Sequence, residues 1–79
     1  MLTEYIAAAM RRAHYEVIED GTYFGEIPDL QGLWANASTL EACRTELQES
    51  LEDWLLIGLR LGHPIPVVEK IDLNAITVA

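Results

Sequence analysis

The sequence has only one cysteine, Cys43, so the chain cannot form an internal disulfide. Proteins without disulfides are typical of the reducing cytoplasm. No apolar run approaches the ~20 residues of a membrane-spanning helix, and Glu4 stands where a signal peptide would be basic. The sequence therefore predicts a cytoplasmic protein that does not bind membranes.

Basic residues are also scarce, since the chain has 5 Lys and Arg against 13 Asp and Glu, a formal net charge of −8. Between Glu16 and Asp53 the only basic residue is Arg44, beside ten carboxylates. Such a surface repels phosphate backbones, which argues against direct nucleic-acid binding and favours a basic protein partner. The apolar fraction of 51% excludes a disordered chain.

Residues with catalytic or metal-binding chemistry do not converge in the sequence. Glu49 and Asp53 lie one helical turn apart, but a lone helix face offers too few oxygens for a divalent metal. Glu16 and Glu26 share a strand face with apolar side chains, unlike the carboxylates of a two-metal site. The two histidines lack a partner at a telling spacing, and no glycine loop is suited to phosphate. We expect no catalytic residue, metal or cofactor, so the chain is not predicted to be an enzyme.

The strongest pattern present is a long amphipathic helix over residues 38–62. Ser38 as N-cap and Glu41 three residues later form a capping box. Gly62 offers the left-handed residue that closes a helix, and Pro64 and Pro66 cannot continue one. The apolar stripe at helical spacing, which makes Cys43 a small buried hydrophobe rather than a redox residue, consists of Leu40, Cys43, Leu47, Leu51, Trp54, Gly58 and Leu61.

The second half of this helix predicts self-association. The helix would be about 36 Å long, whereas a compact domain of this size is only about 30 Å across, so one end overhangs. Residues 54–59 are apolar nearly all the way round, and one sheet can cover only one side. We therefore expect a homodimer or tetramer whose interface includes Trp54, Leu55, Leu56 and Leu59.

The first 13 residues predict a short helix, from Glu4 to about Arg12 with Thr3 as its cap. Arg11 and Arg12 then lie where the helix dipole favours cations, which leaves open a phosphate or partner contact as the minor alternative. The apolar stripe of this helix would be Leu2, Ile6, Ala9, Met10 and Ala13.

From His14 the apolar period changes to two, which predicts a three-stranded meander over residues 14–37. The residues Glu19, Asp20 and Gly21 would form a three-residue hairpin loop with Gly21 in the left-handed region. In this register the helix-facing side chains are Tyr15, Val17, Tyr23, Gly25 and Ile27, and the opposite face carries Glu16, Ile18, Phe24 and Glu26.

A turn over 27–32 precedes the third strand, Leu33 to Ala37. Trp34 points away from Leu33 and Ala35, so it is either an exposed anchor for a partner or packed under the first helix. Residues 67–79 predict a C-terminal strand over 67–71, with an extension toward Val78 left open. The expected fold is one α+β domain over 1–79, a two-layer α-β-β-β-α-β arrangement with the antiparallel meander packed on the long helix.

Four segments in order resemble the HicB antitoxin family, including its stand-alone HicB-like members. They are YFGEIPDLQG at 23–32, ASTLEAC at 37–43, EDWL at 52–55 and HPIP at 63–66. The resemblance covers roughly residues 14–68, and the ordered set is more specific than any single segment. The chain departs from the family pattern at Gln31, where proline is usual, and at Leu33, where cysteine is usual.

This resemblance implies a fold similar to a degenerate RNase H-like sheet that lacks the catalytic carboxylates of that fold. It also implies a non-enzymatic antitoxin that neutralises HicA, a small basic toxin that cleaves mRNA with a histidine. Many family members carry a C-terminal DNA-binding domain. Because the sequence ends about a dozen residues after the Pro-x-Pro, operator binding is not carried over.

The acidic face is the expected partner site, and the contacts would come from Glu16, Glu26, Asp29 and Trp34. The alternative is a solitary oligomeric protein-interaction domain that has lost its toxin. A neighbouring gene for a small basic protein would favour the first interpretation, and an isolated gene would favour the second.

Overall fold

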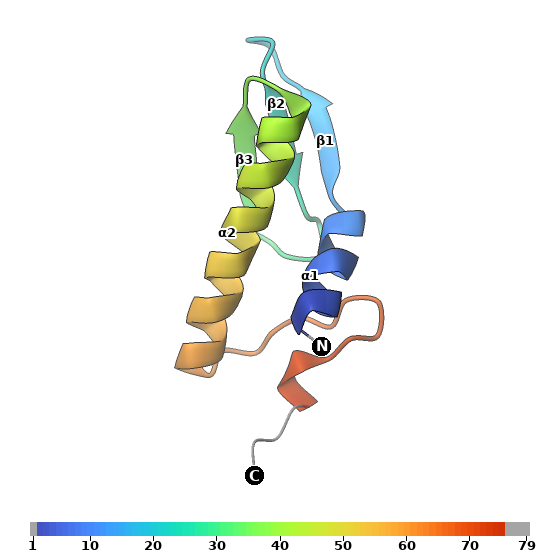
Figure 1. Cartoon of the computed structure of the whole chain (residues 1–79), viewed down its shortest axis with the longest axis vertical. Helices are drawn as coiled ribbons and strands as arrows, with labels where there is room; N and C mark the ends of the chain where they lie inside the picture. Colours follow the sequence, from blue (N-terminus) through green and yellow to red (C-terminus); the bar gives the residue numbers. More distant parts are fainter. Residues whose placement is uncertain (1, 76–79) are drawn as a thin grey trace.

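A computed structural model describes residues 2–75 of the chain. A helix leads into three strands, a long helix follows, and the last element is a single 3-10 turn, which makes a small α+β fold as predicted (Figure 1). The elements are α1 (Leu2–Arg11), β1 (His14–Val17), β2 (Tyr23–Glu26), β3 (Trp34–Ala37), α2 (Leu40–Leu61) and η1 (Leu73–Ala75).

The three strands form an antiparallel meander in the order β1-β2-β3. Val17 pairs with Tyr23, and the next pair is closed by a hydrogen bond of 2.9 Å from the Ile18 amide to the Thr22 carbonyl. Gly21, with φ of 83°, takes the left-handed position that the three-residue loop requires. The predicted hairpin loop and register are therefore confirmed.

Helix α2 begins slightly later than the sequence suggested. The N-cap is Thr39, whose hydroxyl accepts a 3.1 Å hydrogen bond from the Ala42 amide. The predicted capping box on Ser38 and Glu41 is wrong, because the backbone at Thr39 is extended and its oxygen faces the first free amides. The C-terminal prediction is correct, since Gly62 has φ of 72° and closes the helix.

The buried face of α2 lies against β3 and β2 along the first half of the helix. Four predicted stripe residues, Cys43, Leu47, Leu51 and Gly58, are buried, whereas Leu40 and Leu61 are exposed. Leu55 is only 1% exposed and belongs to the core of the single chain, so its assignment to an oligomer interface is corrected. Leu55 lies on the buried face because it follows Leu47 and Leu51 at intervals of four residues, which places the three side chains on the same side of the helix.

Close approach of the sheet and α2 depends on Gly25. A Cβ at this position would lie 2.8 Å from the Tyr15 ring and 3.1 Å from Cys43 Sγ. The absence of a side chain lets the Tyr15 ring cover the middle of the sheet. Val17, assigned to the same face, is instead 60% exposed, at the hairpin end of β1.

Helix α1 lies beside the middle of α2 rather than on the sheet (Figure 1). Its buried residues are Tyr5, Ala8, Ala9 and Met10. The predicted stripe was correct for Ala9 and Met10 but wrong for Leu2, which is exposed, and it missed Tyr5. The Tyr5 hydroxyl donates a 2.7 Å hydrogen bond to the Pro66 carbonyl, which joins α1 to the segment after α2.

The predicted C-terminal strand is wrong within the described residues. Val68 and Ile71 form an isolated antiparallel bridge, and Glu69 and Lys70 between them have φ of 46° and 67°. A tight turn of two left-handed residues cannot continue a strand. The Asn74 side chain instead bonds both the amide and the carbonyl of Ile65, at 2.8 and 2.5 Å. The suggested extension toward Val78 lies outside the described residues.

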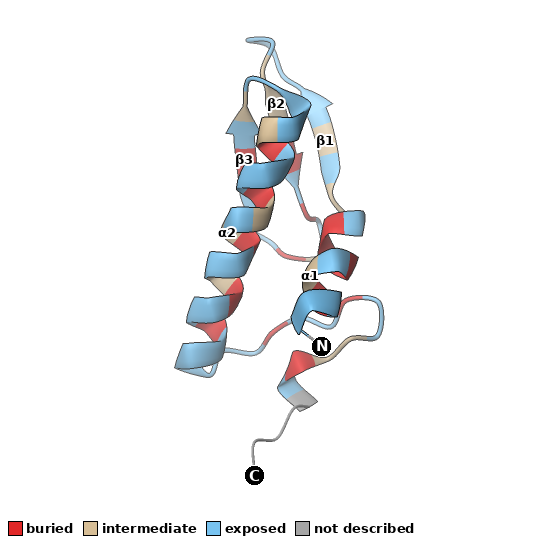
Figure 2. Ribbon diagram, viewed as in Figure 1, coloured by how far each residue is buried: buried red, intermediate tan, exposed pale blue. Residues whose placement is uncertain are grey.

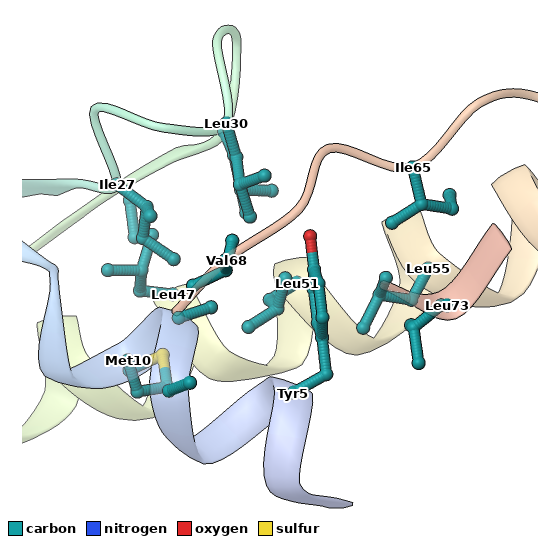
Figure 3. Close-up of a cluster of buried hydrophobic side chains, with 14 of the residues drawn as sticks. Tyr5, Met10, Ile27, Leu30, Leu47, Leu51, Leu55, Ile65, Val68 and Leu73 are labelled. Atoms are coloured by element: carbon teal, nitrogen blue, oxygen red, sulfur yellow. The ribbon is translucent and has the colours of Figure 1, made fainter. Parts of the chain in front are cut away.

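The buried residues form one core cluster, and Figure 2 shows them along the inner side of α2 and in the segments facing it. Toward the C-terminal half of α2 the Tyr5 ring lies between Leu51 and Leu55, and Ile65 and Leu73 lie at that end of the core (Figure 3). The molecule is elongated, 49 × 22 × 18 Å, which fits a helix too long for a compact domain of this size. None of the helices over residues 2–75 is long and apolar enough to cross a membrane.

Candidate protein-binding face

The side of the sheet away from α2 carries two cross-strand rows of side chains. One row is His14, Glu26 and Trp34, and the other is Glu16, Phe24 and Asn36. All six are exposed or half-exposed, whereas Gly25 and Ala35 on the α2 side are buried. We call these six residues, His14, Glu16, Phe24, Glu26, Trp34 and Asn36, the open face.

An aromatic pair lies at the centre of the open face. The Phe24 and Trp34 rings stack with centroids 6.0 Å apart and planes at 21°. They occupy diagonal positions on neighbouring strands, which long aromatic side chains can bridge. Trp34 is 58% exposed, so the alternative in which it packs under α1 is wrong. Large exposed aromatic surfaces of this kind are typical of contact sites for other proteins.

The charge of the open face is entirely negative. Glu16 and Glu26 are exposed, and neither forms an ion pair within residues 2–75. The three strands contain no Lys or Arg. A partner with basic groups would therefore meet two available carboxylates beside an apolar ring pair.

Two shallow hollows adjoin the aromatic pair. The first, of about 300 Å³, is lined by His14, Glu16 and Phe24 among others, and the second, of about 340 Å³, extends to Gln31 and Trp34. Phe24, Glu26 and Pro28 line both. Their volumes are at the lower limit for small-molecule sites, and hollows of this size accept single side chains of a protein partner.

A hydrogen-bond network holds the hairpin end of the open face. Asp20 accepts bonds from the amide and hydroxyl of Thr22, which hold the pKa of this carboxyl below its usual range. Asn36 donates to the Thr22 hydroxyl at 2.7 Å and to the Tyr23 carbonyl at 2.9 Å. The hairpin loop is thereby tied to β3, which limits the motion of the face.

Asp29 does not belong to the open face. Its carboxylate accepts a 2.9 Å bond from Arg12 Nε, and the neighbouring Arg11 bonds Glu69 at 2.7 Å. The turn after Pro28 brings the chain back to the end of α1, where Arg11 and Arg12 both form ion pairs within the chain. The structure thus brings together Glu16, Glu26 and Trp34 and separates Asp29 from them.

Sequence reasoning placed Phe24 on the face of Glu16 and Glu26 but did not select it as a site residue. Its diagonal relation to Trp34 follows from the strand register, which pairs Glu26 with Trp34. That register was the signal that could have identified the aromatic pair. Of the predicted interface residues on α2, Leu56 and Leu59 are exposed and Trp54 is half-buried.

The residues considered for chemistry are dispersed. Cys43 is fully buried, with its Sγ 3.6 Å from the Ala35 carbonyl, and burial raises the pKa of its thiol. His14 begins β1 and His63 follows the end of α2, both at least partly exposed. Within residues 2–75 no group of three His, Cys, Asp or Glu side chains is placed to hold a metal ion.

Comparison with known proteins gives a family and a similar structure. Residues 4–66 match the model of the UPF0150-like family. The fold is similar to the crystal structure of TTHA0281 from Thermus thermophilus, with a TM-score of 0.89 and 44% sequence identity. That similarity covers 96% of this chain and 95% of the other. No curated protein matches the chain in sequence.

Proposed function

The chain belongs to the UPF0150-like family, and from that premise we propose that it is a HicB-like antitoxin module. It binds a small basic HicA-like toxin through the open face and does so without catalysis. The observation that carries the proposal is the stacked Phe24–Trp34 pair flanked by Glu16 and Glu26, on strands without a basic residue.

The two kinds of side chain have separate roles in this proposal. A toxin that grips RNA must present a positive surface, and the carboxylates of the open face attract it over long range. The aromatic pair then supplies the apolar contact area that slows dissociation. Inhibition is steric, because a toxin whose RNA groove is occupied cannot reach its substrate.

The experiment is to isolate binding partners from the native host with the tagged chain and then measure the kinetics with the purified basic partner. Replacing Trp34 by Ala should weaken affinity about thirtyfold or more, mainly through faster dissociation. Reversing Glu16 and Glu26 together to Lys should slow association and flatten its salt dependence.

A matched control is the reversal of Glu46 to Lys on α2, where the side chain is exposed and does not belong to the open face. It changes the net charge of the chain in the same direction but leaves the open face intact. The proposal is wrong if Glu46→Lys slows association as much as a single reversal at Glu26. It is also wrong if a toxin binds and the Trp34→Ala variant retains full affinity.

The second candidate is a solitary interaction domain that has lost its toxin and binds another basic protein. The same acidic, aromatic face supports it, so only the identity of the captured partner distinguishes the two. A captured ribonuclease that this chain inhibits supports the antitoxin proposal. A captured basic protein without nuclease activity supports the second candidate.

A further inference from the structure

The outer side of α2 carries a second apolar surface, remote from the open face because the helix separates the two. Leu56 and Ile57 are each 57% exposed, and Leu59 is exposed as well. Figure 2 shows the exposed residues continuing along this side of the helix to its end. Three large apolar side chains within four positions are more than a solvated helix normally exposes.

This surface also lies in a stretch of the chain without negative charge. No Asp or Glu occurs between Asp53 and Glu69, although the chain has 13 carboxylates. Two copies of a chain with net charge −8 repel each other over most of their surfaces. They can approach most closely where the carboxylates are missing.

A stripe along the outer side of α2 carries acidic residues toward its N-terminal end and a basic residue toward its C-terminal end. Two copies of this stripe placed antiparallel would bring opposite charges together. Its members, Glu49, Asp53, Leu56 and Arg60, are spaced by three or four residues and lie opposite the buried Leu47, Leu51 and Leu55. Asp53 and Arg60 are two turns apart, and neither has an ion-pair partner within residues 2–75. The midpoint between them falls between Leu56 and Ile57.

We infer that a second copy of this chain packs on this stripe, with the two α2 helices antiparallel and the two-fold axis beside Leu56 and Ile57. In this arrangement Arg60 faces Asp53 of the partner subunit, and Asp53 faces Arg60 of the partner subunit. The apolar side chains on both sides fill the contact between these two ion pairs. A two-fold pair of this kind is the commonest form of homo-oligomer.

A parallel arrangement does not satisfy the charges. It would place Arg60 beside Arg60 of the partner subunit and Asp53 beside Asp53 of the partner subunit, and both pairs repel. A basic heterologous partner is also poorly matched, because the centre of the surface is aliphatic and is flanked by one acidic and one basic residue, Asp53 and Arg60. The antiparallel homodimer is the occupant that uses both the apolar area and the two charges.

The dimer leaves both open faces accessible, since each lies on the far side of its sheet from α2. It would therefore present two binding faces per assembly. The inference does not depend on the antitoxin proposal, because it rests on α2 alone.

The first test is the molar mass of the full chain, measured by sedimentation equilibrium across micromolar concentrations. We expect a dimer, and Leu56→Glu should raise its dissociation constant about thirtyfold or more. The matched control is Leu40→Glu, an exposed leucine at the other end of the same helix, which should leave the dimer intact. A monomer at every concentration overturns the inference, as does equal dissociation by both variants.

The second test addresses the antiparallel register. Asp53→Arg and Arg60→Asp should each weaken the dimer about tenfold, because each creates two repulsive contacts across the axis. The double variant restores both pairs in reversed order and should recover most of the original affinity. If the double variant is weaker than either single variant, the register is wrong. Far-UV circular dichroism verifies that every variant keeps its helix content.

Discussion

The two ends of the molecule are stabilised in different ways. In the sheet end, which comprises β1 to β3 and the first half of α2, backbone ladders and a capped helix start hold the chain. The opposite end comprises α1, the second half of α2 and residues 63–75, and we call it the helical end. It is joined by side chains, with Tyr5 bonded to Pro66, Asn74 to Ile65 and Arg11 to Glu69.

Because of this difference, a single substitution should destabilise the two ends of the molecule to different extents. A backbone ladder is formed by every residue type except proline, so single substitutions in the strands remove little of it. A joint made by side chains is lost when one side chain is changed. The helical end is therefore expected to open at lower free energy than the sheet end, as regions with fewer backbone bonds do.

The largest expected effect comes from the core of the helical end. Replacing Leu55 by Ala removes a side chain that is almost fully buried and should lower the free energy of unfolding by about 3 kcal/mol. Urea denaturation measures the loss. Hydrogen exchange should show amides of α1 exposed before those of β2, and simultaneous exposure of both would contradict the distinction between the ends.

A smaller loss should follow from overpacking the sheet end. Gly25→Ala places a Cβ against the Tyr15 ring and Cys43 and should cost about 2 kcal/mol. Because the clash lies between the sheet and α2, hydrogen exchange should rise across β2, while exchange in α1 stays as it is in the native chain. Gly58→Ala is the comparison in the helical end, where a Cβ meets only the flexible tip of Ile65 at 3.0 Å. Its cost should be smaller, and an equal cost would contradict the close-approach argument for Gly25.

Removing the hydroxyl of Tyr5 and that of Tyr15 gives a matched pair of variants, whose free energies of unfolding should differ by about 1 kcal/mol. Tyr5→Phe removes the bond to Pro66 and leaves that carbonyl without its partner, so it should destabilise the chain by about 1 kcal/mol. The Tyr15 hydroxyl is buried and makes no hydrogen bond within residues 2–75, so Tyr15→Phe should cost nothing or stabilise slightly. Thermal unfolding of the two variants measures both, and equal losses would remove the special role of the Tyr5 hydroxyl.

The Tyr5 hydroxyl also predicts that the helical end loses stability at alkaline pH. Burial, with a smaller contribution from Asp29, raises the pKa of Tyr5 to about 12 from its ordinary value near 10. Above pH 10 the unfolded chain loses this proton more readily than the folded chain, so stability falls as pH rises from about 10 to 12. Melting temperatures over this range should decline in the native chain, and this component should be missing in Tyr5→Phe.

The smallest effect is expected at the exposed ion pair between α1 and the C-terminal segment. The hydrogen bond from Arg11 holds the pKa of Glu69 below its usual range, so the pair stabilises the chain above that usual value and less as pH falls. Arg11→Gln should lower the melting temperature slightly near about pH 7, and the difference should vanish near about pH 3. Arg44→Gln, an exposed arginine without an ion pair within residues 2–75, is the control and should show no such pH dependence.

The sequence determined the parts of the fold that depend on neighbouring residues. The hairpin loop followed from Gly21, the end of α2 from Gly62, and the side of β3 on which Trp34 lies from alternation along that strand. Each of these rests on local backbone conformation or on the period of a strand, which a few adjacent residues specify. Thr39 in place of Ser38 shows the limit of such reasoning, because two adjacent hydroxyl residues can both serve as a cap.

Only the tertiary structure decided what depends on distant partners. Leu55 became core and Leu56 stayed exposed because α1 and the segment after Gly62 cover one side of the apolar second half of α2. Asp29 lies outside the acidic site because the fold brings it to Arg12. The residues after Val67 turn rather than extend, and the Asn74 side chain beyond the turn bonds back to Ile65. Such contacts join residues far apart in the chain, so their energies depend on packing that no local pattern encodes.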